Sequence, residues 1–434
     1  MRTIRLRAVT LMLAIVGSVA QPVLAQTPAS DQALRDAQAE VARLQQELAA
    51  MREQYDSRLK ALEDKLAALA AEAPPAEPAP PAAQPPAPPP VELPPAPTPV
   101  PGATSSNAKV FNPDIAVIGN FLGAAGHNPN SDQPTFGLDE VETSLQAIVD
   151  PYARADVFLS AGPDGLDVEE GFVTFNTLPG GLLLKAGKMR AQFGKVNTMH
   201  THVLPWTDRP LVSENLVGGD EGISESGLSV SRLLPNRFMF VELTGETFYG
   251  SSEVFDSHKR TDLVYVARAR AYRDLTEGTN LDVGSSFAYG PSAIVPDFLS
   301  PEHTSTRLFG VDATFRYRPL RRAIYKRFIA RSEFIWSQPH ESGVTLPTAF
   351  GLYASGDYQF ARRWYAGARY DRSGRAFEAT TTDNGGSFYL TYWPSEFNQL
   401  RGQYRRTNYG DGVHANEFLF QFLFSIGAHG AHVF

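Results

Sequence analysis

The amino-acid sequence predicts an all-β fold, a 16-stranded antiparallel transmembrane β-barrel, over residues 112–434 of the 434-residue chain. Three observations support this prediction. The last stretch of the chain alternates aromatic and polar residues, the residues before it supply an even number of strand-like runs, and the connections between these runs alternate between short and long. A signal peptide, an α-helical coiled coil and a proline-rich linker are predicted to precede the barrel.

The terminal stretch, residues 416–434, has the period-two pattern of a β-strand. Its even positions from 418 to 426 are apolar and mostly aromatic, namely Phe418, Phe420, Phe422, Phe424 and Ile426, and the even positions continue with Ala428, Gly430, His432 and Phe434. Its odd positions include Glu417, Gln421 and Ser425. Successive side chains of a strand point to opposite faces, so one face is a row of aromatic rings and the other is mixed. Such a face would need a core to pack on in water, whereas it is already well placed against lipid.

Fifteen further runs with strand character precede the terminal one. They cover residues 114–126, 138–149, 152–160, 168–177, 182–193, 227–234, 237–247, 261–273, 281–289, 308–318, 328–337, 350–360, 364–372, 387–393 and 397–407. One set of connections, such as 150–151 and 235–236, is mostly short, and the other, such as 127–137 and 194–226, is mostly long. Short turns on one rim, long loops on the other and an even strand count are typical of bacterial outer-membrane barrels.

A soluble β-sandwich or β-propeller is the alternative fold. No repeat period is evident, which argues against a propeller. Aromatic residues such as Tyr358, Trp364 and Trp393 lie near the ends of predicted strands, where the interfacial girdles of membrane barrels are found. Both observations favour the membrane barrel.

The N-terminal residues predict three segments outside the barrel. Residues 1–25 have the basic start, the apolar stretch and the small-residue cleavage site of a secretory signal peptide. Residues 26–73 predict a periplasmic coiled coil, because apolar residues from Leu34 to Leu69 follow heptad spacing; a lone amphipathic helix is the alternative. Residues 74–111 form a proline-rich linker, which favours an extended polyproline spacer.

Composition excludes several classes of protein. The formal net charge is −8, which argues against a nucleic-acid partner. The chain contains no cysteine, so disulfides and thiolate metal sites are excluded. A signal peptide predicts export of the chain to the cell envelope. The predicted location is therefore the outer membrane, with the N-terminal segment in the periplasm.

One stretch, residues 182–231, carries a recognisable succession of motifs. A glycine-basic motif, residues 187–190, leads to Phe193-Gly194, then to Asp208-Arg209, and then to residues 222–228. This succession resembles the phosphate-selective porin superfamily of bacterial outer-membrane barrels, some members of which carry an N-terminal coiled coil. The resemblance implies a trimeric sixteen-stranded channel whose third long loop, 194–226 in this sequence, folds into the lumen and narrows it. Phosphate specificity is not implied, because the phosphate-coordinating positions do not match residue by residue.

The polar face of each predicted strand should line the lumen. Early strands contribute mainly acids to this face and later strands mainly arginines. The predicted pore-lining residues are Glu140, Glu142, Arg154, Asp156, Glu170, Glu242, Arg268, Arg270, Arg316, Arg331, Arg369, Arg401 and Arg405. On opposing arcs of a closed barrel these charges would set up a transverse field across the pore. The alternative is that they pair across neighbouring strands and stiffen the wall.

The long loop, residues 194–226, is predicted to form a constriction. Its apolar side chains would face water on an extracellular loop, whereas folding inward gives them a wall to pack on: Leu204, Trp206, Leu211, Val212, Leu216 and Val217. The residues expected to face the solute path are Lys195, Asp208, Arg209 and Glu214. Contact of the apolar side chains with a neighbouring protomer is the alternative.

Metal and catalytic chemistry have only weak signals. His200 and His202 lie near carboxylates of the same loop, and such a set can bind zinc. Exposed loop histidines are usually only polar, however, so no metal site is predicted. Residues 222–227 superficially resemble a nucleophile elbow but lack the Gly-x-Ser-x-Gly spacing. No enzyme activity and no cofactor are predicted.

The expected function is that of a porin, a channel for passive diffusion of small hydrophilic solutes, with anionic solutes among the candidates. The expected partners are outer-membrane lipid, the solutes in the pore, two further copies in a homotrimer, and peptidoglycan contacted through the N-terminal region. The alternative is a structural tether in which the coiled coil reaches the cell wall and the barrel is only an anchor. An energy-coupled receptor is excluded, because about twenty-two strands and a plug domain do not fit in residues 112–434.

Overall fold

The computed structural model describes residues 113–427, apart from residues 132, 164, 294, 297–298 and 300–302. The chain divides into two compact units, Met1–Thr98 and Pro99–Phe434, and all described residues belong to the second. The predicted signal peptide, coiled coil and proline-rich linker lie outside the described residues, as do residues 428–434.

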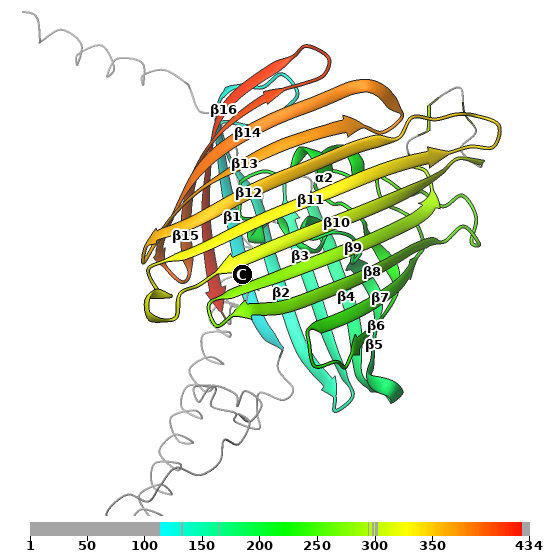
Figure 1. Ribbon diagram of the computed structural model, residues 1–434, viewed down its shortest axis with the longest axis horizontal. Coiled ribbons are helices and arrows are strands. Elements are labelled where there is room, and N and C mark those ends of the chain that lie inside the picture. Colours follow the sequence, from blue (N-terminus) through cyan, green and yellow to red (C-terminus); the bar gives the residue numbers. More distant parts are fainter. Residues whose placement is uncertain are drawn as a thin grey trace, which may run out of the picture. The chain divides into compact units, whose positions relative to one another are not determined.

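The described residues form a closed barrel of antiparallel strands (Figure 1). The strands are β1 (Asp114–His127), β2 (Phe136–Asp150), β3 (Ala153–Gly162), β4 (Gly165–Leu178), β5 (Leu182–Arg190), β6 (Ser224–Leu234), β7 (Phe240–Phe248), β8 (Val264–Thr276), β9 (Thr279–Pro291), β10 (Ser305–Tyr317), β11 (Arg327–His340), β12 (Ala349–Ala361), β13 (Trp364–Arg375), β14 (Glu378–Ser395), β15 (Asn398–Asn408) and β16 (His414–Gly427). Each strand pairs with its neighbours in sequence, and β16 pairs with β1 to close the barrel. The predicted fold class is therefore confirmed.

Strand β16 shows the alternation that the sequence predicts. Glu417, Leu419 and Gln421 are buried on the inside, whereas Phe418 is 54% exposed and Ile426 is 62% exposed on the outside. Other strands follow the same rule, with outward Val230, Leu243 and Phe388 exposed. The wall thus presents an apolar outer surface and a polar inner one. No helix among the described residues is long and apolar enough to cross a membrane.

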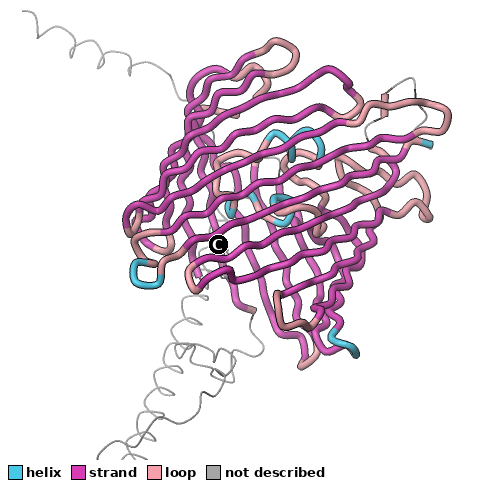
Figure 2. The backbone as a smooth tube through the Cα atoms, viewed as in Figure 1, coloured by secondary structure: helices cyan, strands magenta, loops and turns pink. Residues whose placement is uncertain are grey.

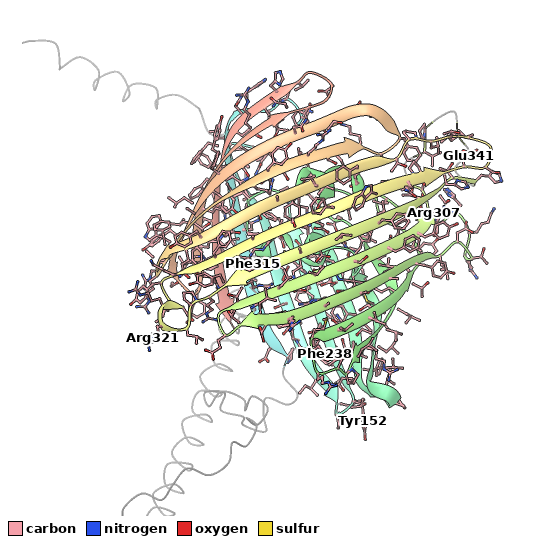
Figure 3. All side chains as sticks on the ribbon, in the orientation of Figure 1. Tyr152, Phe238, Arg307, Phe315, Arg321 and Glu341 are labelled. Carbon is pink, nitrogen blue, oxygen red and sulfur yellow. The ribbon has the colours of Figure 1, made fainter. Side chains whose placement is uncertain are left out.

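The two rims of the barrel differ in their connections. Tyr152, Phe238 and Arg321 lie in the turns of the rim that carries the shorter connections, while Arg307 and Glu341 lie near the opposite rim (Figure 3). Tyr152 and Phe238 are 62% and 64% exposed, as expected for aromatic residues at a membrane interface.

The longest connection joins β5 to β6 and covers residues 191–223, which we call the inner loop. It contains η3 (Val196–Thr198), η4 (Thr201–Val203) and α2 (Leu211–Leu216), and Figure 2 shows its helical turns in cyan behind the wall strands. The loop begins three residues earlier than predicted, because β5 ends at Arg190 and Ala191 already donates its amide to Ile223 at the loop's far end.

Candidate functional site

The inner loop packs against the inside of the barrel wall. All six apolar side chains whose burial was expected are buried: Leu204, Trp206, Leu211, Val212, Leu216 and Val217. All of them except Leu211 belong to one hydrophobic cluster with wall residues such as Ile335, Tyr353 and Tyr389, and helix α2 contacts β11 to β14. The cluster resembles an ordinary protein core placed inside the barrel.

Glycines in the wall and in the loop make this close packing possible. A Cβ atom at Gly351 of β12 would lie 2.6 Å from a methyl group of Val212, so a larger residue would displace α2. Gly194 has a φ of 62°, and a Cβ there would overlap the carboxylate of Glu333. That carboxylate accepts hydrogen bonds from the backbone amides of Lys195 (3.0 Å) and Val196 (3.3 Å). The Phe193-Gly194 pair therefore sets the direction in which the loop enters the lumen.

Asp208 fixes the middle of the inner loop to the wall through charged hydrogen bonds. Its carboxylate accepts from Arg369 of β13 at 2.7 Å and from Arg405 of β15 at 2.8 Å. Burial alone would raise the pKa of Asp208, but the two arginines lower it to about 2, so the group stays ionised at neutral pH. Arg369 also stacks its guanidinium 4.8 Å from the centre of the Trp206 ring.

Three predicted pore-lining arginines lie beneath the inner loop rather than along an open path. Arg268, Arg369 and Arg401 are 7%, 3% and 4% exposed. Arg268 donates to the carbonyl of Gly194, and Arg401 donates to the carbonyl of Leu204 at 3.0 Å. These side chains face inward as predicted, but they donate hydrogen bonds to backbone carbonyls of the inner loop instead of lining an open path.

Most of the remaining charges are paired across the wall, as the alternative expectation proposed. Arg268 pairs with Asp312 at 2.8 Å, Arg270 with Asp282 at 2.8 Å, and Arg405 with Glu417 at 2.6 Å. Arg331 pairs in the same way with Asp357 and Arg316 with Asp282, whereas Arg154 pairs with Asp156 of its own strand, β3. Glu242 lies opposite Arg270 in the register of β7 and β8. Pairing of this kind reduces the transverse field that segregated charges would produce.

The early strands carry a cluster of glutamates around the two loop histidines. His200 Nδ1 lies 2.7 Å from Glu142 and 2.6 Å from Glu169, and its Nε2 lies 2.9 Å from Glu170. Burial alone would lower the pKa of His200, but its hydrogen bonds to these carboxylates raise it well above the usual value. His202 Nδ1 lies 3.4 Å from Glu142. The expectation that these histidines are exposed is wrong, because folding of the loop into the lumen buries His202 and leaves the His200 side chain only 11% exposed against β2 and β4.

Glu169 was missed by the sequence analysis. Strict alternation along β4 places only one of two consecutive residues inside the barrel. The register shifts at Phe158 and Leu159 of β3, which pair with Glu170 and Val168 and leave Glu169 as an extra residue in β4. This β-bulge lets both glutamates reach His200. The adjacent pair Glu169-Glu170 is the only feature of the sequence that could have indicated the role of Glu169.

A cavity of about 980 Å³ lies on one side of the inner loop. Of the predicted constriction residues, Asp208, Arg209 and Glu214 line it; Lys195 instead lies 3.5 Å from Asp282 in the wall. Four arginines line the cavity, namely Arg190, Arg209, Arg375 and Arg405. Nine acids line it, namely Asp139, Glu140, Asp167, Glu169, Asp208, Glu214, Asp220, Glu221 and Asp383. The side chains that line this cavity therefore carry a net negative formal charge.

Replacing Asp208 with asparagine should weaken the attachment of the inner loop and shift ion preference towards anions. The substitution leaves Arg369 and Arg405 without one of their partners, and breaking a buried ion pair typically costs about 3–5 kcal/mol. The reversal potential in a salt gradient measures the charge effect. Asp150→Asn, which removes an exposed acid in a rim turn, is the control. An Asp208→Asn variant with unchanged reversal potential and unchanged loop protection would contradict this assignment.

Comparisons with known proteins support the fold. No family model matches the chain. An uncharacterized protein of Aquifex aeolicus (strain VF5) is 28% identical over 369 residues, which cover 77% of this chain and 77% of that protein. The high-pH structure of OprB from Pseudomonas putida gives a TM-score of 0.51 at 11% identity, covering 74% of this chain and 95% of that one. A loop-deletion mutant of OmpT, an outer membrane protein of Vibrio cholerae, gives a TM-score of 0.50 at 11% identity, covering 73% of this chain and 100% of that one. The chain thus shares the closed-barrel fold of these structures.

Proposed function

We propose that this protein is a passive porin of the bacterial outer membrane. The supporting observation is a closed sixteen-stranded barrel with an apolar outside and an inside that combines paired charges, a packed loop and a sizeable polar cavity. Barrels of sixteen to eighteen strands are wide enough for an aqueous channel. A barrel that served only as an anchor would have no need of a cavity lined by so many charges.

The outer surface favours a lipid environment. Exposed apolar side chains are spread over the wall from Leu138 on β2 to Ile426 on β16. Contiguous apolar surface of this extent is costly in water and favourable in a bilayer. If the N-terminus lies in the periplasm, the rim of short turns faces the periplasm, and the inner loop starts from the extracellular rim.

The proposed solutes are small and hydrophilic, with a preference for cations. The expectation of anionic solutes depended on late-strand arginines, most of which are paired or lie under the inner loop. The cavity, in contrast, is lined by more acids than arginines. Clefts lined by one sign of charge concentrate ions of the opposite sign.

Diffusion of uncharged sugars of increasing size into liposomes tests the porin function. Liposomes that contain the full-length protein should swell in monosaccharides and fail to swell above a size limit set by the inner loop. Liposomes reconstituted with heat-denatured protein are the control. Absence of swelling with any sugar, in vesicles whose barrels are folded, would favour the tether function.

Raising the pH should strengthen the preference for cations. Burial, together with Asp220 and Asp208, raises the pKa of Glu214 to about 8. Glu214 is therefore mostly neutral at pH 6 and mostly charged at pH 9, which adds one negative charge to the cavity. The reversal potential of the wild type should shift towards that of a cation channel across this range, and Glu214→Gln should shift less. Identical pH profiles for the two proteins would contradict this role of Glu214.

We also propose that the protein is a member of the phosphate-selective-porin-like superfamily and that it assembles as a homotrimer. Two glycines of the motif support the first part: Gly187 in β5 and Gly194 in the inner loop both have positive φ angles, which favour glycine. The heptad spacing of residues 34–69 supports the second. Native mass spectrometry of the full chain, compared with a variant in which Leu44, Leu48, Leu62 and Leu66 are serine, tests whether the N-terminal segment contributes to trimerisation.

A further inference from the structure

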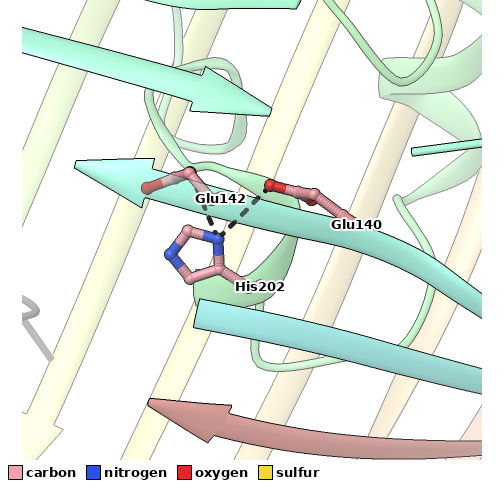
Figure 4. A group of neighbouring side chains, drawn as sticks. All are labelled: Glu140, Glu142 and His202. Carbon is pink, nitrogen blue, oxygen red and sulfur yellow. Dashed lines mark ion pairs between the residues drawn. The ribbon is translucent and has the colours of Figure 1, made fainter. Parts of the chain in front are cut away.

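A second type of site lies where the inner loop meets strand β2. His202 of η4 points towards two glutamates of β2, as Figure 4 shows. Its Nδ1 atom lies 3.4 Å from Glu142 Oε2 and 3.8 Å from Glu140 Oε1 (Figure 4). The three potential ligand atoms lie within 4.8 Å of one another. Zinc ligands sit about 2.0–2.2 Å from the ion, which places neighbouring ligand atoms of a tetrahedron roughly 3.3 Å apart. The group is therefore close to the spacing that an ion requires.

The two carboxylates and the imidazole of this group are buried, and burial of carboxylates without a cation costs free energy. Glu140, Glu142 and His202 are 7%, 2% and 8% exposed. Among the described residues, Glu140 Oε1 has no hydrogen-bond partner, although it is buried and directed towards His202. A buried carboxylate oxygen in this position loses its hydration without gaining a replacement. A metal ion bound between the three side chains would replace the lost hydration of this oxygen.

The neighbouring histidine has a different role. His200 makes contacts of 2.6–2.9 Å with Glu142, Glu169 and Glu170, which are shorter than the roughly 3.3 Å between neighbouring zinc ligands, so these groups are held by hydrogen bonds to one another. Its contact with Glu142 instead orients that carboxylate towards His202. Hydrogen bonds to a metal-binding carboxylate commonly fix its direction in this way. His200 is therefore a positioning residue for the neighbouring group.

We propose that Glu140, Glu142 and His202 bind a divalent transition-metal ion of the zinc class. A donor set of one imidazole and two carboxylates suits zinc better than calcium or magnesium, which prefer oxygen ligands alone. Glu140 also lines the large cavity, so the ion has a route to the site and a coordination position that water can occupy. The site joins the inner loop to the wall, and bound metal would hold the loop in place.

Equilibrium binding of Zn²⁺ to the full-length protein in detergent tests the proposal independently of any channel activity. The protein should carry a purification tag without histidine and be treated with a chelator before calorimetric titration. The wild type should bind one ion per chain. His202→Gln and Glu140→Gln should each weaken binding about ten-fold or more, the scale on which metal sites respond even to the loss of supporting residues. His414→Gln and Glu396→Gln, which alter exposed residues far from the site in sequence, should bind as the wild type does.

X-ray absorption of the zinc-loaded protein supplies a second readout. It should show nitrogen and oxygen ligands at about 2.0–2.1 Å and a histidine contribution that is lost in His202→Gln. The migration of unheated samples in gel electrophoresis confirms that each variant barrel is folded. Absence of binding by the folded wild type, or equal binding by folded His202→Gln and wild type, would overturn the proposal.

Discussion

Deletion of residues 200–216 should raise the single-channel conductance about two-fold or more, because a sixteen-stranded barrel without its inner loop has the lumen of a wide aqueous pore. The deletion joins Met199 to Val217 through a short Gly-Ser linker. It removes α2 and Asp208, so Arg369 and Arg405 of the wall become solvated rather than buried. The strand ladder does not depend on the loop, since residues 416–427 of β16 pair with residues 116–127 of β1 and close the barrel. Conductance steps and the size limit for polyethylene glycol entry measure the effect.

Deletion of residues 342–347 is the matched control. These residues connect β11 to β12, and they do not contribute to the hydrophobic cluster that holds the inner loop. The control channel should keep the conductance of the wild type. Unchanged conductance and size limit in the 200–216 deletion, with the barrel folded, would show that the inner loop does not restrict the solute path.

Replacing Trp206 with alanine should release the inner loop from the wall. Trp206 is 1% exposed, meets the Tyr353 ring edge-on with centres 5.1 Å apart, and donates to the hydroxyl of Tyr389 at 3.2 Å. Truncation of a buried tryptophan typically costs about 3–5 kcal/mol. We expect faster amide hydrogen exchange in residues 204–217 and flickering between conductance levels.

Trp364→Ala provides the comparison for this experiment. Trp364 lies at the start of β13, is 37% exposed, and stacks on Tyr392 with ring centres 4.5 Å apart. Its removal deletes the same side chain from the outer surface and should leave exchange in the inner loop unchanged. If both variants behave alike, the packing of Trp206 does not hold the loop.

The sequence was sufficient to predict the barrel because the determining signals are local. Alternation along β16 separates Phe418 from Glu417, and turns such as 151–152 mark the strand ends. The inward position of the apolar loop residues was predicted from their hydrophobicity, because six large apolar side chains cannot remain in water at low cost, together with the family resemblance of residues 182–231. Strand ends were predicted less well; β14, for example, begins at Glu378 rather than at Ser387.

The details of the lumen depend on contacts that are distant in sequence. Asp208 meets Arg369 and Arg405, which lie 161 and 197 residues away, and no local pattern indicates that these groups pair. The β-bulge at Glu169 changes which side chains face inward without a change of composition. The histidines were assigned as exposed because their loop has no regular pattern, and only the folded loop places His202 beside Glu140.

Single-channel recording of the full-length protein in planar lipid bilayers tests the central claim most directly. We predict stepwise conductance that is open at low voltage, with a reversal potential in a potassium chloride gradient that favours cations. Purified, folded protein that inserts into the bilayer and conducts no ions would contradict a porin function.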